Sequence, residues 1–102
     1  LVRFPRVTPA PDRIVRDGRF WSGGGVTAGI DLALAIAAEV VDTAYAQSVQ
    51  LAIEYAPAPP FDAGRPDTAP PDVVARMQER LQTMGAEREA AVLRASGRLQ
   101  AA

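Results

Sequence analysis

Short apolar runs separated by turn residues predict a β-hairpin near the start of the chain. Residues 14–16 and 20–21 are strand-like and flank Asp17 and Gly18. An Asp-Gly pair favours the two positive-φ positions of a type I′ turn, the usual turn of a two-residue hairpin loop. We therefore expect a hairpin over residues 13–22.

The pattern becomes helical after the hairpin. From Thr27 to Val41 almost every residue is apolar. A helix that is apolar around most of its circumference must be buried on several sides, so we expect a further layer of structure against it. A second, amphipathic helix is predicted from Asp42, a favourable N-cap residue, to about Tyr55. The prolines that follow cannot continue a helix.

Residues 57–71 contain six of the nine prolines and predict a stiff, extended arm. Phe61 is an apolar anchor in the middle of this arm with nothing local to pack on. We expect the arm to lie beside a pocket or across a dimer interface, with Phe61 mostly buried. The alternative is a solvated linker whose phenylalanine covers a local patch. The candidate arm residues are Pro60, Phe61 and Asp62.

The last helix is expected to open at Pro70 and Pro71, because proline suits the first turn of a helix. Gly85 should weaken or break this helix, and the tail from Arg94 onward is expected to fray. The chain is then part of one domain with five segments: an irregular lead-in (1–12), the hairpin (13–22), a glycine loop with two helices (23–56), the proline-rich arm (57–71), and a C-terminal helix with its tail (72–102).

Composition narrows the chemistry. The 102 residues contain no cysteine and no histidine, which excludes disulfides, thiolate nucleophiles, the usual zinc sites and imidazole bases. We expect no catalytic residue in this chain, no cofactor and no metal. The net charge is -1 with 11 basic residues spread along the chain, so nucleic acid is not an expected partner. No apolar run reaches the roughly 20 residues of a membrane span, so we expect no membrane partner, and these residues show no basic-plus-apolar pattern of a signal peptide.

The glycine loop is the candidate binding site. A glycine turn that leads from a strand into a helix leaves the backbone bare and directs N–H groups toward the space above the helix. The spacing Gly23-x-Gly25-x-x-Ala28 also satisfies the dinucleotide fingerprint, but Asp42 starts a helix where that fold needs a strand. The candidate substrate-pocket residues are Gly23, Gly24, Gly25, Val26 and Thr27.

Three polar residues near the loop are given structural interpretations. We expect Thr27 to cap the first helix. Asp31 and Glu39 lie on the apolar helix, and we interpret both as paired or at its edge, rather than as catalytic acids.

Two stretches in order resemble the C-terminal half of the ThiJ/PfpI superfamily, in its isonitrile hydratase-like branch: DGRFWSGGGVTAGIDLALAIA and AQSVQLAIEYAPAPPFDAGRPDTAPPDVV. Ser22 stands where the branch usually has threonine. The resemblance covers about residues 12–80. It implies the C-terminal part of a flavodoxin-like three-layer α/β/α sandwich, here an edge hairpin followed by about three helices.

The resemblance also implies a cysteine-dependent hydrolase or hydratase that forms homodimers and acts on a small molecule. Its nucleophilic cysteine and nearby acid would lie upstream of Leu1, so this chain would need the upstream half of the same domain. The chain is then a fragment, a processed product or a shortened version of a longer, cytoplasmic protein. Two alternatives stay open: the non-catalytic sensor domain of an amidotransferase-like transcription regulator, and a dimerisation or structural module.

Overall fold

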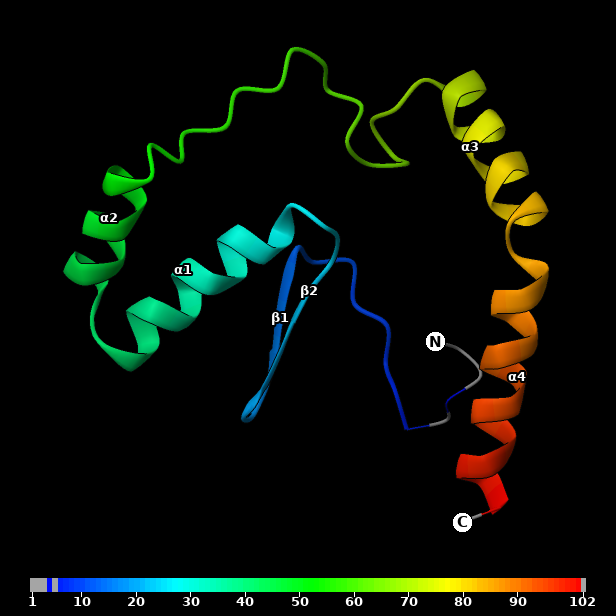
Figure 1. The fold of residues 1–102 in the computed structure, drawn as a ribbon. Helices are drawn as coiled ribbons and strands as arrows, with labels where there is room; N and C mark the ends of the chain where they lie inside the picture. The colour runs from blue at the N-terminus through cyan, green and yellow to red at the C-terminus, as the bar shows by residue number, and fades with distance from the viewer. Residues whose placement is uncertain (1–3, 5, 102) are drawn as a thin grey trace. The chain divides into compact units, whose positions relative to one another are not determined.

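The computed structural model describes Phe4 and residues 6–101 as two compact units joined along the chain (Figure 1). One unit is Pro9–Pro57; the other contains Ala58–Ala102 and the N-terminal segment to Thr8. Residues 1–3, 5 and 102, at the outer ends of the expected lead-in and tail, lie outside the described residues. The described part of the chain forms a two-stranded hairpin followed by four helices.

The hairpin is confirmed, but its turn differs from the prediction. Strands β1 (Ile14–Asp17) and β2 (Phe20–Gly23) pair antiparallel, and Asp17 lies opposite Phe20. The loop is therefore Gly18-Arg19, and only Gly18 has a positive φ, of 58°. Glycine with positive φ at the first central position is the type II′ pattern. The predicted type I′ turn was wrong by one residue, because pairing continues through Asp17.

The two predicted helices of this unit are present. Helix α1 spans Ala28–Val40 and α2 spans Thr43–Ala52. Asp42 caps α2 as expected: its Oδ1 accepts a hydrogen bond from the backbone N–H of Tyr45 at 2.7 Å.

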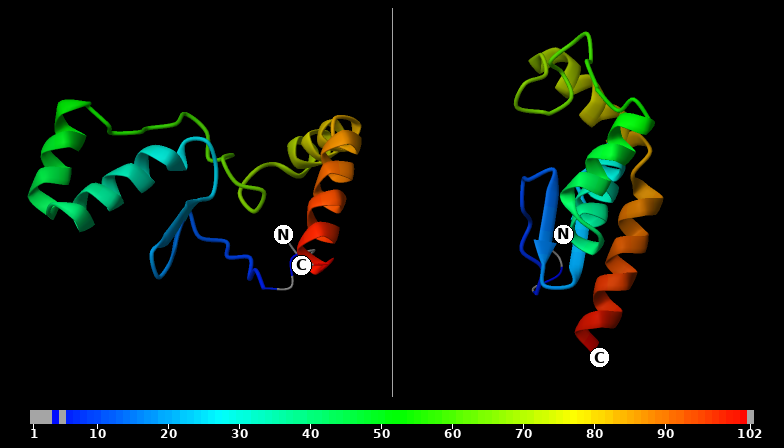
Figure 2. Two further views of the ribbon diagram at one scale, coloured as in Figure 1. Left: turned by 60° about the horizontal axis from the view of Figure 1, so that its bottom comes forward. Right: turned by 90° about the vertical axis from the view of Figure 1, so that its left-hand side faces the viewer.

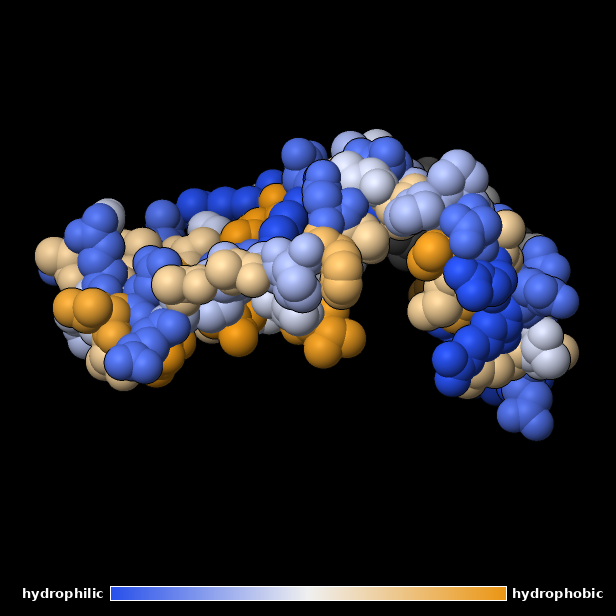
Figure 3. All heavy atoms as spheres, turned by 90° about the horizontal axis from the view of Figure 1, so that it is seen from above, coloured by the Kyte–Doolittle hydropathy of each residue, from blue (hydrophilic) through white to orange (hydrophobic). Residues whose placement is uncertain are grey.

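Helix α1 packs against both strands and against α2. The reader can trace these elements in Figures 1 and 2. The residues buried here are small: Ala28 is fully enclosed and Ala46 nearly so. Larger apolar side chains of α1, such as Ile30 and Ile36, remain substantially exposed, and hydrophobic residues reach the surface of both units in Figure 3. The described chain thus leaves apolar surface on α1 that the expected further layer would cover.

Arg16 attaches the hairpin to the C-terminal end of α1. It lies across the ladder from Trp21, with its guanidinium 4.5 Å from the ring centroid. The Nη2 atom of Arg16 also donates to Oε1 of Glu39 at 2.9 Å. Glu39 is therefore paired, as its structural interpretation predicted.

The second unit contains α3 (Pro71–Thr83) and α4 (Ala86–Ala101), and the bend between them is seen in Figure 2. Proline occupies the first turn of α3, as predicted. The residues between Pro57 and α3 form turns and irregular backbone without a regular element. The predicted fraying from Arg94 was wrong, because α4 continues to Ala101. No helix within the described range has both the length and the apolarity needed to cross a bilayer.

Gly85 separates the last two helices for a steric reason. A Cβ atom built on it would lie 2.6 Å from the carbonyl oxygen of Leu81, which is backbone and cannot swing aside. Gly97 lies inside α4, about one turn before its end, and a Cβ atom built on it would meet no atom within 4 Å. The two glycines therefore provide a matched pair.

We expect Gly85→Ala to lower the free energy of unfolding by about 1–3 kcal/mol, the usual cost of forcing atoms into a filled space. Gly97→Ala should instead raise it by about 1 kcal/mol, because alanine is the better helix former. Thermal and denaturant melts of the two variants measure this difference. Equal stabilisation by both substitutions would contradict the steric explanation.

Candidate functional site

The glycine loop is held by the backbone that precedes β1. The N–H of Gly24 donates to the carbonyl oxygen of Arg13 at 2.8 Å, immediately after Gly23 ends β2. A Cβ atom on Gly24 would lie 3.3 Å from the carbonyl oxygen of Asp12, whereas one on Gly25 would meet no atom of the chain within 4 Å. Gly24 thus faces the protein's own backbone, and Gly25 faces open space.

The first amides of α1 are already used within the loop. The N–H groups of Ala28, Gly29 and Ile30 donate to the carbonyl oxygens three residues earlier, at 3.1 to 3.4 Å. These bonds belong to a tight first turn and leave those three donors occupied. The expectation that the loop presents free N–H groups is therefore wrong for these three. Val26 is 99% exposed at the tip of the loop.

Thr27 has a different partner from the one we expected. It occupies the N-cap position of α1, but its side chain makes no capping hydrogen bond. Its Oγ1 instead accepts a hydrogen bond from Nη2 of Arg13 at 3.0 Å. Thr27 thus takes the predicted cap position, but the expected capping bond was wrong: the residue has a helical backbone, and its hydroxyl group binds a side chain from the segment before β1.

Asp31, in the first turn of α1, is the centre of this arrangement. Its Oδ2 accepts a hydrogen bond from Nε of Arg13, and its Oδ1 accepts one from the hydroxyl of Tyr55 at 2.6 Å. We call Arg13, Thr27, Asp31 and Tyr55 the Asp31 network. The structural interpretation of Asp31 as a paired acid is confirmed. Arg13 and Tyr55 were not among the predicted site residues.

The network favours the charged form of its carboxylate. Hydrogen bonds from Arg13 and then from Tyr55 lower the pKa of Asp31 below its usual range, against the effect of partial burial. The hydrogen bond to Asp31, together with desolvation, raises the pKa of the Tyr55 hydroxyl. At neutral pH the carboxylate is therefore ionised and the tyrosine keeps the proton that it donates.

The end of α2 determines where Tyr55 lies. Glu54 has a φ of 51°, and its N–H donates to the carbonyl oxygen of Leu51, while the N–H of Tyr55 donates to that of Gln50, both at 3.1 Å. These two bonds form the Schellman motif that ends helices with a left-handed residue. The left-handed position is usually glycine, so Glu54 at this position is strained.

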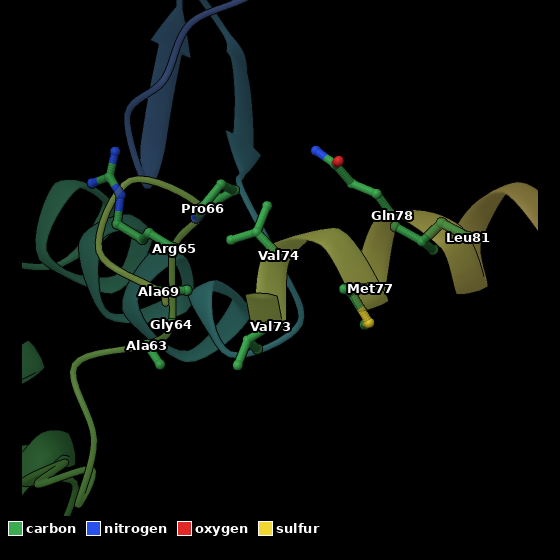
Figure 4. Close-up of a pocket in the computed structure, with 10 residues that line it drawn as sticks. All are labelled: Ala63, Gly64, Arg65, Pro66, Ala69, Val73, Val74, Met77, Gln78 and Leu81. Atoms are coloured by element: carbon green, nitrogen blue, oxygen red, sulfur yellow. The ribbon is translucent and has the colours of Figure 1, made fainter. Parts of the chain in front are cut away.

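The proline-rich arm contributes apolar surface to the second unit. A groove of about 310 Å³ runs between residues 63–69 and the start of α3, where Val73, Val74 and Met77 line it (Figure 4). Phe61 is 78% exposed in the single chain. The described chain therefore provides no socket for Phe61, and its expected burial is not found within this chain. Burial by another segment or subunit stays a prediction, as does the role of Pro60 and Asp62 in a dimer or pocket arm.

Comparisons with known proteins identify the family. No family model matches the sequence. The crystal structure of a ThiJ/PfpI family protein from Pseudomonas syringae matches with a TM-score of 0.71 and 45% identity over 74% of this chain and 31% of that chain. The chain belongs to the ThiJ/PfpI superfamily, and the predicted fold class, part of a flavodoxin-like α/β sandwich, is confirmed, with four helices instead of about three.

Within this superfamily the chain is similar to isonitrile hydratase of Pseudomonas putida. The two are 55% identical in an alignment of 91 residues, and the match covers 83% of this chain and 40% of that protein. The predicted resemblance to the isonitrile hydratase-like branch is confirmed. The chain spans less than half the length of each of these two relatives.

The lowered pKa of Asp31 predicts how stability changes with pH. A carboxylate whose pKa is lowered in the folded state contributes stability above the unfolded pKa of about 3.9 and loses it as the pH falls through the folded value. We expect Asp31→Asn to lower the melting temperature at pH 7. The gap between variant and wild type should narrow below about pH 4 as Asp31 becomes protonated. A gap of constant size from pH 7 to pH 3 would contradict this assignment.

Proposed function

We propose that the chain forms part of a cysteine-dependent hydratase that adds water to an isonitrile and yields an N-substituted formamide. The observation that carries this proposal is the 55% identity to isonitrile hydratase over 83% of the chain. The nucleophile would lie outside these 102 residues, because the sequence has no cysteine. The role of this chain is then to form one wall of the substrate pocket.

The exposed apolar surface of α1 supports a role inside a larger domain. Ile30, Ile36 and Val40 are all more than a third exposed, yet they lie on a helix whose sequence is typical of a buried one. Covering such side chains with the sheet of a three-layer domain stabilises each by about 1.5–3 kcal/mol relative to full exposure. We propose that the upstream half of the same domain supplies this sheet.

The glycine loop is the proposed substrate wall. Val26 is fully accessible, and Gly25 has open space where a side chain would point. In this proposal the substrate occupies that space, opposite the nucleophile. We also propose that the intact protein is cytoplasmic and forms a homodimer.

Substitutions at Gly25 and Gly24 test the proposed wall in the full-length protein. We expect Gly25→Val to lower kcat/KM for an isonitrile by about tenfold or more, a loss of about 1.4 kcal/mol of transition-state binding, with little change in melting temperature. Gly24→Ala should lower the melting temperature, because its Cβ meets the carbonyl oxygen of Asp12 at 3.3 Å.

Full activity of Gly25→Val toward an isonitrile would show that the glycine loop does not line the substrate pocket. A wild-type protein that consumes no isonitrile would contradict the proposed reaction itself.

Phe61 tests the proposed dimer. If a second subunit encloses its ring, Phe61→Ala should raise the dimer Kd by about thirtyfold, which corresponds to about 2 kcal/mol. Phe20, 68% exposed on the hairpin, is the matched control, and Phe20→Ala should leave the Kd unchanged. Sedimentation of the full-length variants at several concentrations measures both. An unchanged Kd for Phe61→Ala would show that the arm lies outside the interface.

A further inference from the structure

We propose that the Asp31 network sets the conformation of the glycine loop, and that Asp31 and Tyr55 are positioning residues for the reaction at that loop. The inference about the reaction rests on the proposed function. The inference about loop geometry rests on the contacts of the network.

Arg13 holds the loop at both ends. Its carbonyl oxygen accepts from the N–H of Gly24, and its guanidinium donates to the hydroxyl of Thr27. The residues between these two contacts include Gly25 and exposed Val26, which are the proposed pocket wall. Glycine restricts its own backbone weakly, so the position of this wall depends on what holds its ends.

Asp31 fixes the side chain of Arg13 in the geometry that reaches Thr27. The guanidinium is planar, so with Nε bound to Asp31 its Nη2 has a defined direction. The Arg13 side chain is half exposed, and without the carboxylate it would be free to extend into water. The contact with Thr27 would then lose its support.

Tyr55 holds the second oxygen of the same carboxylate. It reaches Asp31 from the strained end of α2, where Glu54 takes the left-handed conformation. A strained residue persists where the surrounding contacts determine its conformation. The loop is therefore linked to the ends of three elements: the start of β1, the start of α1 and the end of α2.

The contact between Arg16 and Glu39 makes it possible to distinguish positioning of the glycine loop by the Asp31 network from simple attachment of the hairpin to α1. It also joins the hairpin to α1, at 2.9 Å and with partly exposed side chains, but it lies two turns further along the helix from Asp31. Loss of Glu39 should loosen the hairpin without affecting the two contacts at the ends of the loop. Glu39→Gln is therefore the matched control for Asp31→Asn.

Hydrogen exchange of the full-length protein tests the inference. We expect Asp31→Asn to raise the exchange rate of amides in residues 23–29 by about tenfold, the effect of losing a charge-assisted hydrogen bond. Tyr55→Phe removes a single hydroxyl group and should raise the exchange rate of these amides less. Glu39→Gln should leave the exchange rate within about twofold of the wild-type rate, since exposed ion pairs contribute little to stability. Unchanged exchange in both network variants, or an equal rise in Glu39→Gln, would overturn the inference.

Kinetics provide the second measurement. With an isonitrile as substrate, Asp31→Asn and Tyr55→Phe should lower kcat more than they raise KM, because a misplaced wall affects the reacting geometry. Equal losses in Glu39→Gln would overturn the positioning role. If the wild-type protein leaves isonitriles unchanged, the proposed function fails, and the exchange rates still decide whether the network sets the loop. If Asp31→Asn fails to fold, the same measurements on Tyr55→Phe decide.

Discussion

The unit that carries the candidate site depends on one carboxylate. Asp31 accepts hydrogen bonds from Arg13 on one oxygen and from Tyr55 on the other, so a single side chain joins the segment before β1, the start of α1 and the end of α2. Fully buried apolar side chains contribute little here, because the two most buried residues among these parts are Ala28 and Ala46. Small side chains bring the helices close but bury little apolar area. The polar contacts of Asp31 therefore act together with half-buried side chains such as Leu32 and Leu34 to fix the arrangement around the glycine loop.

Local sequence signals predicted the elements well. The glycines after β2, the cap at Asp42 and the prolines before α3 each act on their immediate neighbours, so their effects can be read from the chain. The prediction placed the hairpin turn one residue too early, because strand pairing decides which two residues remain unpaired. Gly85 was recognised as a weak point or break in the last helix, but the continuation of α4 beyond Arg94 was not, since alanine-rich helices give a weak amphipathic signal.

The network was beyond the reach of sequence patterns. Arg13 and Asp31 are 18 positions apart, and Asp31 and Tyr55 are 24 apart, so no helix or strand period relates them. Tyr55 reaches the carboxylate only because Glu54 adopts a left-handed conformation that its residue type does not favour. Thr27 looked like an ordinary cap for the same reason: its true partner comes from a different segment. The family resemblance, by contrast, was readable because its two motifs are contiguous.

The left-handed glutamate has a consequence for how α2 ends. A helix that stops at glycine stops by local preference, whereas Glu54 disfavours the required backbone by about 1–2 kcal/mol. Pro57 would end the helix a few residues later in any case. The position of the stop is therefore what depends on the tertiary contact made by Tyr55 with α1, and the last turn of α2 and the first turn of α1 should form as one cooperative event. A homologue with glycine or asparagine at this position would end its helix autonomously. Its α2 could then vary in sequence without disturbing the glycine loop.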